Sequence, residues 1–329
     1  MKLAASLVLS AACVFAASAC AQTPFSEAAL EAPTKDAGPL EGTLLTPKSK
    51  PTAFVLIIPG SGPTDRDGNS PMGVRGSTYR LLAEGLASQG VATLRIDKRG
   101  MYGSAGAAKD ANAVTIADYG DDVQSWVTVL KDEAHAPCVW ILGHSEGGLV
   151  ALAAAKDLQG ACGFILVSTP GRTLADVLRA QLKANPANAP LLEQALPAID
   201  ALEQGRRVDT SGMSPALMPL FRPAVQGFLI SMFSYDPSRL IAAITRPVLV
   251  LQGQRDIQVG EQDARLLAKA NPRASLVLLP NVNHVLRTVT SEDRKENLAT
   301  YGDPRLPLAP GVVEAIAEFL GRNAAATGR

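Results

Sequence analysis

A Gly-x-Ser-x-Gly motif spans residues 143–147, and its central Ser145 is the candidate nucleophile of this sequence. The apolar run 139–142 before the motif predicts a buried strand, and the apolar run 149–155 after it predicts a helix. Between a strand and a helix this motif makes a sharp turn that exposes the serine hydroxyl, with glycines where the neighbouring chain passes close. The same turn places the Glu146 N–H at a helix N-terminus, where it can stabilise an oxyanion.

A serine hydroxyl is a good nucleophile only when a base takes its proton and an acid orients that base. The chain contains 3 histidines. His135 precedes the nucleophile strand, at the wrong end of the sheet, and His144 is constrained within the turn itself. His284 follows the last predicted strand, at 275–280, and we therefore predict that His284 is the base.

The acid is expected on a loop after one of the two strands that precede this histidine. No carboxylate follows the strand predicted at 163–168, whereas Asp256 follows the apolar run 247–252, so we predict Asp256. Asp263 is the weaker alternative, because residues 261–270 predict a helix and we expect Asp263 on its surface.

A second oxyanion donor is expected from the glycine-rich turn 59–62, which follows an apolar strand. By position this donor is the Ser61 N–H, although the glycines could serve the turn alone. The acidic residues at 65–69 suggest a calcium loop, but Ser70 and Gly76 stand where that pattern needs Gly and Glu. We reject the metal and expect a hydrogen-bonded loop that shapes the mouth of the site.

Strands that alternate with helices predict an α/β fold, with a mostly parallel central sheet and helices on both faces. The alternation stops after residue 170 and returns near 240, so we expect a core of residues 22–170 and 240–329 with a helical cap insertion at 171–239. Within the insertion, a helix at 191–202 is expected to be interrupted at Pro197. Some large side chains there could line an acyl pocket, although such residues more often pack an insertion onto its base: Met213, Met218, Phe221, Phe228 and Phe233.

Residues 1–21 are typical of an export signal, with Lys2, an apolar stretch and small residues before Gln22. The end of this segment also resembles a lipobox in which Cys20 would be lipidated, but Ala17 stands where that motif normally has Leu. We expect an exported protein, periplasmic or secreted, with a lipid-anchored lipoprotein as the alternative. Residues 22–38 are polar and give no firm element.

Cys138 and Cys162 are the cysteines outside the export segment, and each stands at the start of a predicted parallel strand. Strands joined by one right-handed crossover are neighbours about 4.8 Å apart, a spacing that a disulfide accepts. An exported protein meets an oxidising compartment where such a bond persists. A one-residue change of register would instead point the two side chains apart.

The composition describes a chain long enough for one large domain with an insertion, since it has 329 residues of which 47% are hydrophobic. The formal net charge is zero, which gives no indication of a nucleic-acid partner or an anionic surface. Outside the export segment, no apolar stretch is long enough to span a membrane. The sequence does not indicate an oligomeric state.

The chain resembles α/β-hydrolases of the bacterial serine-aminopeptidase or monoglyceride-lipase-like branch over residues 40–320. Residues 97–100, Asp-Lys-Arg-Gly, resemble the D-x-R-G loop of that branch, although Tyr102 replaces a usual glycine. The segment 249–256 resembles its acid segment, and 280–284 resembles its histidine loop. The resemblance implies hydrolysis through an acyl-enzyme, with no cofactor and no metal, on a small-molecule ester or a short acyl or peptidyl substrate.

We therefore expect a serine hydrolase that cleaves carboxylic esters, in which Ser145 attacks, His284 shuttles the proton and Asp256 orients His284. An exported aminopeptidase is the alternative, and it would need a carboxylate of the insertion to bind a free amino terminus. Three carboxylates are available there: Glu193, Asp200 and Glu203. A non-catalytic binding protein is a third possibility, which the complete set of catalytic residue types argues against. Dehalogenase and epoxide-hydrolase chemistry is disfavoured because it needs an aspartate in place of the serine.

Overall fold

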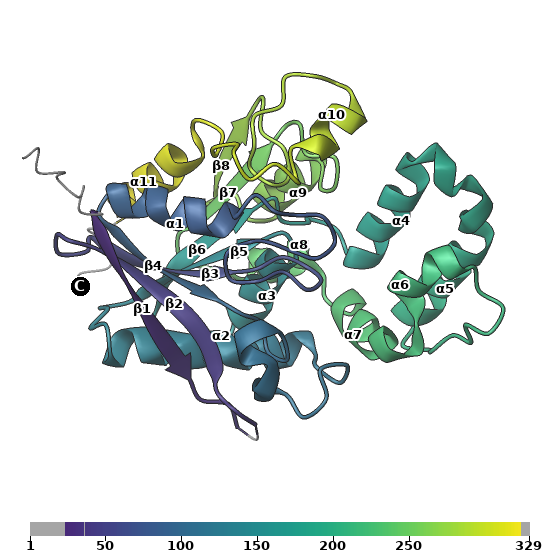
Figure 1. The fold of residues 1–329 in the computed structure, drawn as a ribbon, viewed down its shortest axis with the longest axis horizontal. Helices are drawn as coiled ribbons and strands as arrows, with labels where there is room; N and C mark the ends of the chain where they lie inside the picture. The colour runs from purple at the N-terminus through teal and green to yellow at the C-terminus, as the bar shows by residue number, and fades with distance from the viewer. Residues whose placement is uncertain (1–23, 36, 324–329) are drawn as a thin grey trace, which may run out of the picture.

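One sheet of eight strands forms the centre of the computed structural model, which describes residues 24–35 and 37–323 (Figure 1). The strands are Phe25–Ala32 (β1), Leu40–Pro47 (β2), Ala53–Ile58 (β3), Val91–Ile96 (β4), Val139–His144 (β5), Ala161–Val167 (β6), Val248–Gly253 (β7) and Ser275–Leu279 (β8). Their order is β1-β2-β4-β3-β5-β6-β7-β8. Only the β1–β2 and β2–β4 pairs of this sheet are antiparallel, so the predicted mostly parallel sheet is confirmed.

Helices cover both faces of the sheet because its central strands are apolar on both sides. In β5, Val139 and Ile141 belong to the apolar cluster on one face, whereas Trp140 and Leu142 belong to the cluster on the other. Three helices pack on the first face: Ile116–Asp132 (α2), Glu146–Ala154 (α3) and Glu261–Ala270 (α9). Two helices pack on the second face: Thr78–Ser88 (α1) and Val312–Asn323 (α11). A continuous apolar strand is the pattern expected of this layered arrangement.

Five α-helices and two short 3-10 helices lie between β6 and β7, in the stretch predicted as an insertion. The α-helices are Leu174–Ala184 (α4), Leu192–Glu203 (α5), Met218–Phe221 (α6), Pro223–Phe233 (α7) and Pro237–Ala242 (α8), and the 3-10 helices are Pro186–Leu191 and Pro215–Leu217. In Figure 1, α4 to α7 form a group of their own beside the sheet. The expected interruption at Pro197 is wrong, since α5 continues through it and its buried Ile199 and Leu202 pack into the apolar cluster.

Three further elements lie where no element was predicted. Strand β1 pairs along its whole length with β2 at the edge of the sheet, and most of its side chains are exposed, so no buried pattern marks it in the sequence. A 3-10 helix at Tyr102–Ala107 and the helix Arg294–Ala299 (α10) are too short to carry a clear periodicity. These elements depend on tertiary contacts rather than on local pattern.

The predicted export segment 1–21, with Cys20, lies outside the described residues. In the part of the chain that the structure describes, no single helix is long and apolar enough to cross a bilayer. Residues 215–221 and 223–242 meet that test only as a pair, and they are bent by 53° at the break between them.

Cys138 and Cys162 form a disulfide with a Cα–Cα distance of 5.3 Å, so the pairing that the strand order allows is present. Strands β5 and β6 are adjacent and joined through α3, as a single crossover requires. The register shifts beside the bond, because Val139 pairs with Ala161 and Trp140 pairs with Gly163. Cys162 is the extra residue of this irregularity.

We expect replacement of both bonded cysteines by alanine to lower the free energy of unfolding by about 3 kcal/mol, because the bond closes a loop with a sequence separation of 24. Chemistry at Ser145 should be unchanged, since Ser145 lies at the opposite ends of these strands. Urea denaturation of the two proteins gives the stability, and thiol titration of the denatured wild type before and after reduction confirms the bond. Equal urea midpoints would contradict a stabilising disulfide.

Candidate active site

Ser145 lies at the junction of β5 and α3 in a backbone conformation with positive φ, which is rare for a residue with a side chain: φ is 55° and ψ is −120°. Its N–H donates to the Val167 carbonyl at 2.9 Å, which ties the turn to the neighbouring strand. A Cβ at Gly143 would collide with the Gly147 backbone, and a Cβ at Gly147 would collide with the Ile58 carbonyl. Both glycines of the motif are therefore required by the close passage of the chain.

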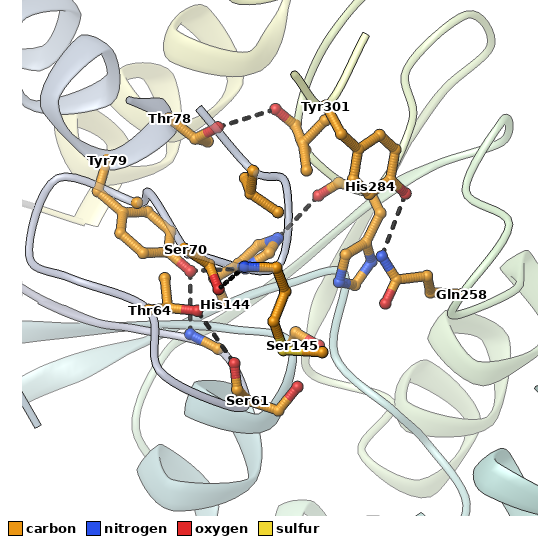
Figure 2. A pocket seen from close by; sticks show the side chains of 15 residues that line it. Ser61, Thr64, Ser70, Thr78, Tyr79, His144, Ser145, Gln258, His284 and Tyr301 are labelled. Atoms are coloured by element: carbon orange, nitrogen blue, oxygen red, sulfur yellow. Dashed lines mark hydrogen bonds between the residues drawn. The ribbon is translucent and has the colours of Figure 1, made fainter. Parts of the chain in front are cut away.

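His284 and Asp256 lie on the loops that follow β8 and β7, at the same edge of the sheet as Ser145. His284 Nδ1 is 2.8 Å from Asp256 Oδ2. Ser145 and His284 line one cavity of about 300 Å³, shown in Figure 2. Within the described residues, the Ser145 hydroxyl makes no hydrogen bond, so it is not committed to another partner. The structure thus brings together the three residues that the sequence singles out.

The Asp256 side chain is fully buried and is surrounded by hydrogen-bond donors. One carboxylate oxygen accepts the N–H groups of Gln258 at 2.8 Å and Val259 at 2.9 Å, and the other accepts the Gln252 amide at 3.2 Å together with His284. Burial alone would raise the pKa of Asp256, but the charge and hydrogen bond of His284 and the two N–H groups outweigh burial and lower it. An ionised Asp256 holds the His284 proton on Nδ1, which leaves Nε2 free to accept a proton.

The two predicted oxyanion donors are the N–H groups of Ser61, which lines the same cavity as Ser145, and of Glu146, which follows Ser145 in the chain. A Cβ on Gly60 would lie 3.4 Å from the Ser145 Cβ, so the turn after β3 passes directly beside Ser145. Glu146 opens α3, where its N–H has no acceptor inside the helix. Across residues 24–35 and 37–323, neither N–H donates to a protein acceptor.

Lys98 is a buried residue of this site to which the sequence analysis assigned no role. Its Nζ donates to the Gly60 carbonyl at 2.7 Å and to Glu146 Oε1 at 3.2 Å. Both charged side chains are buried, and each partner offsets the cost of burying the other. The signal that could have found Lys98 is its position at the carboxyl end of β4, the edge where the other site residues gather.

His144 is buried beside Ser145 and bonds away from the serine hydroxyl. Its Nδ1 is 2.9 Å from the Tyr79 hydroxyl, and its Nε2 is 2.8 Å from the His284 carbonyl. Burial, together with the nearby His284, lowers the pKa of His144 to about 3. His144 is therefore neutral near neutral pH. The sequence analysis did not single out Tyr79, which lies on the buried face of α1.

The loop at 65–69, rejected as a calcium site, is a hydrogen-bonded turn. Asp65 Oδ1 accepts the N–H groups of Asp67 at 2.9 Å and Asn69 at 2.8 Å. Arg66 ties the loop to the core through Asp97, at 2.9 Å from Nε and 2.6 Å from Nη2. In the described ranges no cluster of three or more His, Cys, Asp or Glu side chains could hold a metal ion. Residues of this loop and its flanks line the cavity: Thr64, Gly68 and Ser70.

The expectation that Asp263 lies on a helix surface is wrong, because its side chain is completely buried. It accepts two hydrogen bonds from the Arg172 guanidinium, at 2.9 and 2.8 Å, and two more from the N–H groups of Gly171 and Arg172. These partners lie far away in the sequence, so the local sequence pattern could not predict them. Asp263 anchors the start of the insertion to α9 and does not bond to His284.

No residue of the insertion lines the cavity that contains Ser145. Four of the large side chains that could have formed an acyl pocket instead belong to the apolar cluster or pack against it: Met213, Phe221, Phe228 and Phe233. Of the three insertion carboxylates, Asp200 and Glu203 pair with Arg179 at 2.6 and 2.5 Å. Polar core side chains complete the cavity wall, where the Gln258 amide donates to the Tyr301 hydroxyl at 3.1 Å (Figure 2).

The sequence and the fold of this chain are similar to those of known hydrolases. The model of the family described as "Alpha/beta hydrolase family" matches residues 55–299. Esterase EstD of Thermotoga maritima is 27% identical over 252 residues, which cover 75% of this chain and 58% of EstD, so the chain spans little more than half the length of that relative. The structure of Est1E from Butyrivibrio proteoclasticus superposes with a TM-score of 0.58 at 19% identity, covering 90% of this chain and 99% of Est1E. Proline iminopeptidase from Mycobacterium smegmatis gives a TM-score of 0.58 at 17% identity, with coverage of 91% and 99%.

Replacing each of the two buried aspartates by asparagine separates their roles. We expect Asp256→Asn to lower kcat by about 10⁴-fold, since an amide no longer holds the proton of His284 on Nδ1. Asp263→Asn should leave kcat per folded molecule unchanged and lower the free energy of unfolding by about 3 kcal/mol, because it breaks a buried ion pair. Ester turnover and urea denaturation of both variants provide the two measurements. The reverse pattern would transfer the acid role to Asp263.

The depressed pKa of His144 predicts a pH-dependent stability. The unfolded state takes up a proton near pH 6.5, whereas the folded state does so only near pH 3, so stability is complete above 6.5 and falls as the pH is lowered toward 3. In this window the contribution of His144 is about 1.4 kcal/mol per pH unit. Urea denaturation of wild type and His144→Gln at several pH values measures the difference, and other titrating groups cancel between the two proteins. Parallel pH profiles would show that His144 titrates normally.

Proposed function

The chain belongs to the alpha/beta hydrolase family, and from this premise we propose that it cleaves carboxylic esters through an acyl-enzyme formed on Ser145. The observation that carries the proposal is the 2.8 Å hydrogen bond between the buried Asp256 and His284, a residue that lines one cavity together with Ser145. Asp256 holds His284 in the tautomer whose Nε2 can take the serine proton.

In the proposed reaction the Ser145 oxygen attacks the ester carbonyl while His284 Nε2 accepts the serine proton. The N–H groups of Ser61 and Glu146 donate to the oxyanion of the tetrahedral intermediate. The carbonyl reforms, the bond to the alcohol oxygen breaks, and His284 gives its proton to that oxygen. Water, activated by His284, then attacks the acyl-enzyme carbonyl and releases the acid and free Ser145.

The cavity supports an ester hydrolase over an aminopeptidase. None of its lining residues is an aspartate or glutamate, so within the described chain it offers no carboxylate for a free amino terminus. The insertion carboxylates do not reach it, and Asp200 and Glu203 are paired with Arg179. The name of the Thermotoga maritima relative, an esterase, favours the same choice.

We further propose that the preferred esters carry short acyl chains. The cavity holds about 300 Å³, and several of its lining side chains bear hydroxyl or amide groups: Ser61, Thr64, Ser70, Thr78, Gln258 and Tyr301. A long hydrocarbon chain bound against this wall would displace water from these polar groups without replacing their hydrogen bonds, which costs free energy.

Export remains part of the proposal, with residues 1–21 as the signal and Cys20 as a lipid attachment point in the alternative. The disulfide between Cys138 and Cys162 supports an oxidising compartment. We also propose that the helices at 171–239 act as a cap that controls the entry of substrate into the cavity, whereas residues of the core catalyse the reaction.

We expect Ser145→Ala to lower kcat by at least about 10³-fold with the fold retained, because loss of one triad member disables the unit. Initial rates on p-nitrophenyl acetate, with circular dichroism as the control for folding, measure this. A variant that keeps a tenth of the wild-type rate would exclude Ser145 as the nucleophile.

Two reagents separate the competing functions. A fluorophosphonate probe should label wild type and not Ser145→Ala, whereas an unlabelled wild type would favour a non-catalytic binding protein. Acyl esters should be cleaved faster than aminoacyl amides, and the reverse order would favour the aminopeptidase.

A further inference from the structure

We propose that Tyr79 and His144 are positioning residues, which join the oxyanion turn at Gly60 to the backbone of His284 through one ordered line of hydrogen bonds. The inference rests on the proposed function, because it assigns Ser61 as an oxyanion donor and His284 as the base. The line runs from the Gly60 N–H to the Tyr79 hydroxyl at 2.9 Å, to His144 Nδ1 at 2.9 Å, and from His144 Nε2 to the His284 carbonyl at 2.8 Å (Figure 2).

Only one arrangement of protons satisfies every member of this line. The Gly60 N–H can only donate, so the Tyr79 oxygen accepts from it. The single proton of the Tyr79 hydroxyl then goes to His144 Nδ1, which must be unprotonated. His144 therefore carries its proton on Nε2 and donates it to the His284 carbonyl, which can only accept. The line is fully satisfied with His144 as a neutral imidazole.

At one end, the line fixes the peptide that precedes the oxyanion donor. Gly60 is held from both sides, because its N–H donates to Tyr79 and its carbonyl accepts from Lys98 Nζ at 2.7 Å. The Gly60 carbonyl and the Ser61 N–H belong to the same planar peptide unit and point in opposite directions. Holding that carbonyl toward Lys98 therefore turns the Ser61 N–H to the other side.

At the other end, the line holds the backbone of the base. The rings of His144 and His284 lie 4.8 Å apart between centroids, so His144 supports the base by packing as well as by its hydrogen bond. Catalysis makes His284 a cation transiently. A protonated His144 would place a second positive charge at this short distance and would repel the His284 cation. A neutral His144 avoids this repulsion.

Burial makes the line rigid and leaves no solvent to replace a lost partner. Tyr79 is 3% exposed and His144 is 6% exposed. A second contact runs in parallel, since the Thr78 hydroxyl donates to the Val285 carbonyl at 3.2 Å. The first turn of α1 thus connects the histidine loop with the oxyanion turn, two segments that come from opposite ends of the chain.

The first test is Tyr79→Phe, which keeps the ring and removes the hydroxyl. We expect kcat on p-nitrophenyl acetate, per active site titrated with fluorophosphonate, to fall about tenfold with KM unchanged, since a displaced donor weakens only the bound transition state. The inhibition constant of butylboronic acid, which forms a tetrahedral adduct on serine, should rise by a similar factor. Tyr235→Phe is the matched control, because Tyr235 is a partly buried tyrosine that does not line this cavity.

The second test replaces His144 itself. Glutamine presents one acceptor and one donor with a spacing close to that of imidazole, so His144→Gln should retain kcat within about threefold. His144→Leu removes both bonds and should lower kcat to the level of Tyr79→Phe. The double variant Tyr79→Phe with His144→Leu should be no slower than the slower single variant, because both break the same line.

The outcomes distinguish failure of the proposed function from failure of the positioning role. If wild type neither reacts with the fluorophosphonate nor cleaves the ester, the proposed function has failed. If wild type is active and Tyr79→Phe keeps wild-type kcat and boronate affinity, the positioning role is wrong. A lower yield of titrated sites with unchanged kcat per site would also overturn it, since that result describes loss of folded protein alone.

Discussion

The backbone of Ser145 is held at a positive φ, a conformation that a serine adopts only at a cost of about 1–3 kcal/mol. The surrounding chain compensates for this strain. The N–H of Ser145 is bound by Val167 of β6, and the carbonyl of Ser145 accepts from Gly148 at 2.9 Å. The end of β3 presses so closely on Gly147 that no side chain fits there. Three neighbouring strands and one helix therefore define the position of Ser145, which lies near the centre of the sheet.

The polar groups buried around this turn act mainly by orienting backbone amides. Lys98 and Glu146 form a buried ion pair, an interaction that contributes little net stability after the cost of desolvation. The pair is nevertheless informative, because Lys98 also holds the Gly60 carbonyl and Glu146 opens the helix that follows Ser145. A buried charge at this place fixes the direction of the neighbouring peptide groups, which is the property that an oxyanion site requires.

The sequence predicted those features that depend on order along the chain and failed for those that depend on contacts across it. The placement of Ser145, Asp256 and His284 at one edge could be predicted because each follows a strand of the parallel part of the sheet, whose carboxyl ends share that edge. Asp263 was misplaced because its partners in the insertion have no counterpart in the local helical pattern of α9. Tyr79 escaped notice for the same reason, since a tyrosine on the buried face of a helix resembles any other core residue until its hydroxyl is located.

The insertion is attached to the core by a few hydrogen bonds. Its first and last segments meet where the Ser238 hydroxyl donates to the Gly171 carbonyl at 2.6 Å, and Asp263 clamps the entry from α9. The side-chain amide of Gln181, in α4, donates to the backbone carbonyl of Gln258 at 3.0 Å, two residues after Asp256. These contacts tie the insertion to the core near Asp256, whereas core loops build the cavity around Ser145. These attachments are separate from the contacts that hold Ser145, which come from β6, from α3 and from the end of β3.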